Sequence, residues 1–147
     1  MTIFAALFTG FVIGLVLAAP AIVVEIVRPT IKNLPILIDV EIFRGRKVSR
    51  TEELIFSHAL HLFMSTIFGV GYLLLSRIAA APFDFTGFSY ILYVVVFYLV
   101  VGGLLFPLLG LGVFGKHEGK YVPLELLMAH SLYGFCFYLA VNLFFLR

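Results

Sequence analysis

The sequence predicts an all-α integral membrane protein: a bundle of four transmembrane helices, with a cytoplasmic interfacial segment between the first and the second. Hydrophobic residues make up 63% of the 147-residue chain and charged residues only 12%, whereas soluble domains average about 45–50% and about 25%. Four apolar runs are each long enough to cross a bilayer core of about 30 Å. The net charge of +2 is too small to indicate a nucleic-acid partner. We therefore expect membrane lipids as partners, with a homo-oligomer or a larger membrane complex also open.

A single domain holds the four predicted spans, which cover residues 2–27, 52–76, 88–114 and 121–145. The connection 28–50 contains an apolar stretch, 34–43, that is too short to cross a bilayer, so we expect it to lie along the membrane interface. Ser49 and Glu52 have the spacing of a capping box, which predicts the start of the second helix. Pro123 suits the first turn of the fourth.

Charge distribution predicts the orientation. Segments 28–50 and 115–120 carry eight of the ten Lys and Arg residues. Basic loops stay on the cytoplasmic side, so both termini are expected on the outer side of the cell (plasma) membrane.

The second span carries a polar stripe on an otherwise apolar helix. Its members are His58, His61, Ser65, Gly69 and Tyr72, which at 100° per residue fall within about 80° of arc. Ionisable groups at this depth normally face the bundle interior. His61, and His130 on the fourth span, each lie roughly 12–14 Å from the cytoplasmic start of their helix at 1.5 Å per residue. Pro20 and Pro107 fall in the same layer. The predicted polar pocket is His58, His61, Ser65, Tyr72, His130 and Glu25.

Small residues recur at helical spacing on all four spans. Such stripes let two helix backbones approach closely inside a membrane. The residues that we predict to pack against neighbouring helices are Gly10, Gly14, Ala18, Gly69, Gly103 and Gly134.

Several short motifs resemble those of a known family. They are Leu34, Pro35 and Asp39 in the first loop, His61 eleven residues before Tyr72, the Gly and Pro ending of the third span, and His130, Tyr133 and Gly134 in the order H-x-x-Y-G. In these features the chain is similar to the YagU-like small four-helix bacterial inner-membrane proteins, a domain of unknown function. Ser65 stands where such proteins tend to have glycine, and His58 is additional. The resemblance implies architecture and no activity.

Three functions fit these residues. In the first, the histidines form interhelical hydrogen bonds in a structural or accessory subunit. In the second, the polar pocket opens to the cytoplasm and binds or passes a small molecule, a proton or an ion. In the third, His61 and His130 bind a b-type haem or a metal. An enzyme is disfavoured, because no set of nucleophile, base and orienting residue is recognisable and no catalytic residue is predicted.

Overall fold

Four long helices dominate the computed structural model, which describes residues 1–27, 42–43, 46–79 and 85–145. Helix α1 covers Ile3–Val27, α2 covers Arg50–Ala79 and α5 covers Val122–Phe144. The third span consists of α3 (Gly87–Val100), the π-helical turn η1 (Val101–Leu105) and α4 (Phe106–Leu108). All four are long and apolar enough to cross a membrane, which confirms the predicted all-α membrane bundle.

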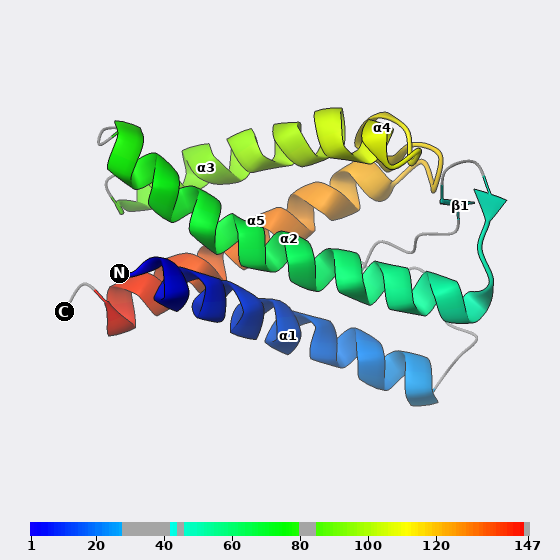
Figure 1. Ribbon diagram of the computed structural model, residues 1–147, viewed down its shortest axis with the longest axis horizontal. Helices are drawn as coiled ribbons and strands as arrows, with labels where there is room; N and C mark the ends of the chain where they lie inside the picture. Colours follow the sequence, from blue (N-terminus) through cyan, green and yellow to red (C-terminus); the bar gives the residue numbers. More distant parts are fainter. Residues whose placement is uncertain (28–41, 44–45, 80–84, 146–147) are drawn as a thin grey trace.

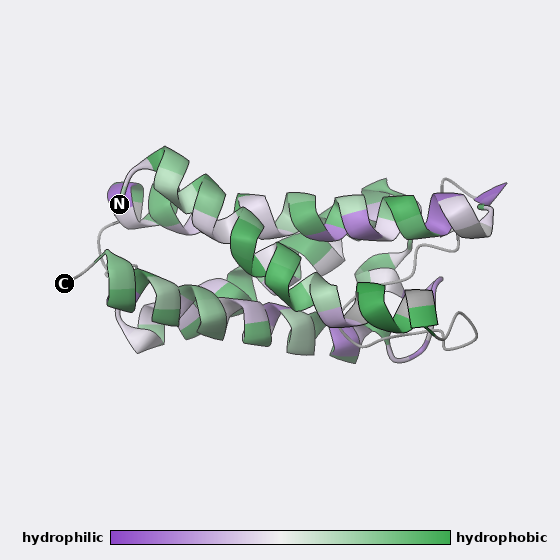
Figure 2. Ribbon diagram, turned by 90° about the horizontal axis from the view of Figure 1, so that it is seen from below, coloured by the Kyte–Doolittle hydropathy of each residue, from purple (hydrophilic) through white to green (hydrophobic). Residues whose placement is uncertain are grey.

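Both chain termini lie at one end of the bundle (Figure 1). At the opposite end lie a short antiparallel hairpin, β1 (Ile42–Phe43) paired with β2 (Arg46–Lys47), and the 3-10 turn η2 (Val113–Gly115). Figure 2 shows mostly hydrophobic ribbon along the long helices and a hydrophilic strand at the hairpin end. Most of the predicted interfacial segment, residues 28–41 and 44–45, lies outside the described residues.

Helix α2 begins at the predicted capping box, which the structure confirms. The Glu52 carboxylate accepts a hydrogen bond from the Ser49 backbone N–H at 2.8 Å, and the Ser49 hydroxyl accepts one from the Glu52 N–H at 3.4 Å. Arg46 of β2 reaches the same carboxylate at 2.9 Å. The hydrogen bond to Glu52 raises the pKa of the Arg46 guanidinium. The Glu52 carboxylate therefore connects strand β2 to the start of helix α2.

The third span ends at Leu108, earlier than the predicted residue 114. Pro107 has no backbone N–H, so one hydrogen bond of the helix is missing there, and the preceding turn is the wider η1. Gly110 and Gly112 then take positive φ angles of 83° and 77°, which stop the helix. Glycine and proline do mark the end of the third span, as the sequence predicted, but the helix stops at Leu108, before Gly110 and Gly112.

Small residues bring α1 and α2 into close contact. A Cβ on Gly10 would lie 2.6 Å from the Ser65 carbonyl oxygen, and a Cβ on Gly14 would lie 2.5 Å from the Ser65 Cβ. A Cβ on Gly69 would likewise lie 2.6 Å from the Ala6 carbonyl oxygen. Ala18 is buried, with 1% of its surface exposed. A side chain at any of these three glycines would collide with the facing helix.

Helices α3 and α5 form a second close pair, where a Cβ on Gly134 would collide with Val94. Gly103 does not pack as expected: it is exposed, and a Cβ there would meet nothing within 4 Å among the described residues. Its neighbour Gly102 is buried against Phe114 instead. The cover over Gly102 comes from Phe114 of η2, which lies beyond the end of the third span, so the periodicity of the helix alone could not select this glycine.

Aromatic side chains fill the space between these two helix pairs. Phe68 on α2 lies at the centre, with edge-to-face contacts to Tyr93 at 4.7 Å, Phe97 at 5.0 Å and Tyr133 at 4.7 Å between ring centroids. Such arrangements match the positive edge of one ring to the negative face of another. The Tyr93 hydroxyl also donates to the Phe68 carbonyl at 2.9 Å. This cluster fixes how α3 and α5 sit against α2.

Candidate functional site

His61 lies on α2 and points toward α1. Its Nε2 is 3.0 Å from the Gly14 carbonyl oxygen. A carbonyl can only accept, so Nε2 carries the proton and Nδ1 of the neutral ring is an acceptor. Gly14 makes this contact possible, because any side chain there would meet Ser65. His61 therefore forms a hydrogen bond between two spans.

His130 lies on α5 and is 9% exposed. Its Nδ1 donates to the Leu126 carbonyl of its own helix at 2.6 Å, so Nε2 is the acceptor in the neutral ring. The ring packs beside Phe97 of α3, with 5.3 Å between ring centroids. In contrast to His61, this histidine has its hydrogen bond within one helix.

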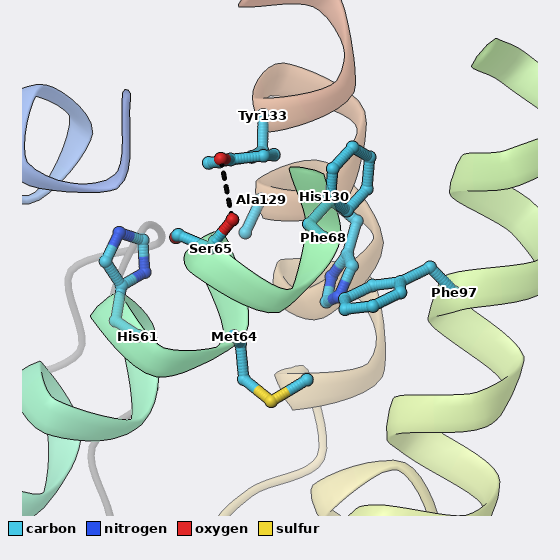
Figure 3. A pocket seen from close by; sticks show the side chains of 8 residues that line it. All are labelled: His61, Met64, Ser65, Phe68, Phe97, Ala129, His130 and Tyr133. Atoms are coloured by element: carbon cyan, nitrogen blue, oxygen red, sulfur yellow. Dashed lines mark hydrogen bonds between the residues drawn. The ribbon is translucent and has the colours of Figure 1, made fainter. Parts of the chain in front are cut away.

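Two adjoining cavities, of about 50 Å³ and about 60 Å³, lie between α2, the third span and α5. His61, Met64, Ala129 and His130 line both of them. Ser65 lines the first cavity, and Figure 3 shows it between the two histidines, which enter from different sides. The structure thus places three of the predicted pocket residues around one small internal space, which we call the histidine cavity.

The other predicted pocket residues lie elsewhere or outside the described side chains. His58 hydrogen-bonds the Leu54 carbonyl of its own helix at 2.7 Å and lines neither part of the histidine cavity. Tyr72 lies at the far end of α2, where its hydroxyl bonds Ser89 of α3. The side chain of Glu25 lies outside the described ones. The stripe on α2 is therefore divided between the cavity and a separate helix contact.

Tyr133 was not predicted as a site residue, although it is central to the arrangement. Its hydroxyl lies 2.7 Å from the Gly10 carbonyl of α1 and 2.8 Å from the Ser65 carbonyl of α2. One hydroxyl has one proton, so the two carbonyls share a single donor. One feature of the sequence could have identified it: Tyr133 follows His130 by three residues, so the two side chains share one face of α5.

A bis-histidine haem does not fit these residues. His61 directs its Nε2 at a backbone carbonyl, and a porphyrin is far larger than cavities of about 50 Å³ and about 60 Å³. In the described part of the chain, no group of three or more His, Cys, Asp or Glu side chains lies close enough to hold a metal ion. The single cysteine, Cys136, is half-buried on α5.

Comparison with known proteins gives no further assignment. No family model, no curated protein and no solved structure matches the chain. The resemblance to the YagU-like proteins therefore stays a prediction. The four apolar helices identify the chain as a small, multi-pass, four-helix integral membrane protein.

Proposed function

We propose that the chain is a non-catalytic structural or accessory membrane subunit, in which buried polar side chains hold the four spans in one arrangement. The observation that carries this proposal is that polar groups of one span bond backbone carbonyls of another. Tyr133 reaches Gly10 and Ser65, and His61 reaches Gly14. These are fixed partners, of the kind that a permanent helix contact uses.

The physical environment supports this role. Lipid tails are as apolar as leucine, so helix association inside a membrane depends on close packing and interhelical hydrogen bonds. Such bonds contribute about 0.6 kcal/mol on average and up to about 2 kcal/mol each. On α1 the Tyr133 and His61 bonds fall at Gly10 and Gly14, one helical turn apart. The two bonds therefore fasten the same stretch of α1.

The test is a pair of substitutions in the histidine cavity, His61→Phe and His130→Phe. Phenylalanine suits an apolar layer but cannot hydrogen-bond. If the histidines are structural, both variants should unfold at lower temperature in detergent. Their effects should also be non-additive, because the two side chains share one cavity. His117→Phe, at an exposed loop residue, controls for the loss of an imidazole. Unchanged unfolding in both variants would remove the proposal.

A second candidate function is a binding bundle, and the histidine cavity favours it. Two imidazoles and Ser65 around a space of about 50 Å³ give a polar lining inside an apolar protein. For this function, His130→Phe should remove ligand or proton dependence while the bundle stays folded. The two functions therefore predict opposite stability results for one variant.

A further inference from the structure

A large apolar groove opens on the side of the bundle, between the first half of α2 and the end of the third span. Its volume is about 490 Å³. The lining residues are Phe56, Ala59, Leu60, Phe63, Leu105, Leu109 and Leu111. Two of these residues, Ala59 and Phe63, are exposed, Phe63 to 58%, so we expect the mouth of the groove to face the lipid phase of a membrane. We call it the lateral groove.

The lateral groove adjoins the histidine cavity. Leu60 lines both the groove and the 60 Å³ part of the cavity. Leu60 is a flexible side chain between the two spaces, and a change in its rotamer would widen the passage from one to the other. A molecule that enters from the bilayer would therefore have its apolar part among leucines and phenylalanines and its inner end at the two histidines.

The inner end has an unusual hydrogen-bond character. His130 donates through Nδ1 to Leu126, and its Nε2 has no hydrogen-bond partner among the described residues. His61 donates through Nε2 to Gly14, and its Nδ1 likewise has none there. Both remaining nitrogens are acceptors. Two acceptors cannot satisfy each other, so a hydrogen bond to either nitrogen needs a donor group, which a bound molecule can supply.

We propose that the lateral groove and the histidine cavity together bind one lipid-like molecule with a single apolar chain and a hydroxyl at its end. The hydroxyl would donate to His130, and the chain would lie against Phe56, Leu60 and Leu105. A cavity of about 50 Å³ has room for a hydroxymethyl group, since a single water needs about 10–15 Å³ by the same measure. This site goes beyond the structural function proposed above and does not depend on it.

The experiment uses the purified full chain in lipid nanodiscs and a photoreactive hexadecanol with a diazirine in its chain. Unlabelled hexadecanol and hexadecyl methyl ether compete with the probe; they differ in that the ether has no proton to donate. The proteins compared are wild type, His130→Phe, Ala59→Trp and Val16→Trp. Ala59 lies on the rim of the groove, so tryptophan there blocks entry. Val16 is 63% exposed on α1 and serves as the matched control.

We expect saturable labelling of α2 and of the third span in the wild type. Hexadecanol should compete at about tenfold lower concentration than the ether, which corresponds to one hydrogen bond of about 1.4 kcal/mol. His130→Phe should remove this difference between the competitors. Ala59→Trp should lose the labelling, and Val16→Trp should keep it. Ala59→Trp also keeps the test decisive if His130→Phe does not fold.

Three results would overturn the proposal. Equal competition by the alcohol and the ether in the wild type would mean that no hydrogen bond is made and that water satisfies the histidines. An unchanged preference in folded His130→Phe would exclude His130 as the acceptor. Full labelling of Ala59→Trp would show that the probe lies on the general lipid-facing surface. None of these results bears on the unfolding experiment, so the two proposals fail separately.

Discussion

The hydroxyl of Tyr133 on α5 lies 2.7 Å from the backbone carbonyl oxygen of Gly10 on α1. The glycine is what allows this approach, because a Cβ at position 10 would lie 3.2 Å from that hydroxyl and 2.6 Å from the Ser65 carbonyl oxygen. Three helices therefore meet at one point, where a missing side chain on α1 makes room for a phenol from α5. The pair acts as one structural unit.

Removing the Tyr133 hydroxyl should weaken this junction. Tyr133→Phe keeps the ring contact with Phe68 and removes only the donor shared by Gly10 and Ser65. We expect a loss of about 1 kcal/mol in the free energy of unfolding, because both carbonyls belong to helices and keep their backbone environment. Denaturant unfolding in a fixed detergent measures the loss. Tyr121→Phe, at a residue 63% exposed, should change nothing; a matching loss there would contradict the prediction.

Two glycines offer a matched test of helix packing. Gly14→Ala places a methyl group 2.5 Å from the Ser65 Cβ, so α1 and α2 must move apart. We expect a cost of about 1–3 kcal/mol, the usual range for overpacking. Gly103→Ala meets nothing within 4 Å among the described residues and should be neutral or slightly stabilising. Thermal unfolding of both variants decides this, and equal destabilisation would refute the packing argument.

Tyr72 fastens the end of α2 to the start of α3. Its hydroxyl accepts from the Phe85 backbone N–H at 3.1 Å and donates to the Ser89 hydroxyl, which donates to the Thr86 carbonyl at 2.8 Å. Tyr72→Phe removes the middle of this chain and should cost about 1–3 kcal/mol, because a partly buried N–H loses its acceptor.

Tyr90 supplies the control for Tyr72. The two rings stack at 4.2 Å between centroids, but the buried Tyr90 hydroxyl has no hydrogen-bond partner in the part of the chain that the structure describes. Tyr90→Phe should therefore be neutral or stabilising, since it removes a buried polar group that lacks a partner. A larger loss for Tyr90→Phe than for Tyr72→Phe, in the same unfolding assay, would show that the hydroxyl network is not what matters here.

The orientation in the membrane can be tested by cysteine labelling. With Cys136→Ala as background, Lys47→Cys on the hairpin should be unreachable by an impermeant maleimide in intact cells. Arg77→Cys, near the end of α2, should react, because the prediction places this end outside. Both positions are exposed in the structure, so burial does not explain a missing reaction. Labelling of Lys47→Cys alone would mean that the orientation is reversed.

The sequence by itself determined the class of the protein and the number of its spans. Hydrocarbon thickness requires about 20 apolar residues for each span, and this requirement can be read without knowing any contact. The capping box at Ser49 and Glu52 was equally local, since both partners lie within one turn. The prediction that His61 and His130 lie in one layer rested only on the rise per residue and the loop positions, and it stays a prediction.

Only the tertiary structure decided which polar residues share a space and which glycines are packed. Tyr72 lies on the same stripe as His61, but it bonds Ser89, because α3 begins beside the far end of α2. Gly102 is packed and Gly103 is not, because Phe114 of η2 folds back onto Gly102. The contact of Tyr133 with Gly10 joins residues at opposite ends of the chain, and such pairings depend on how helices dock. Helical periodicity describes one helix at a time, whereas the junction is a property of three.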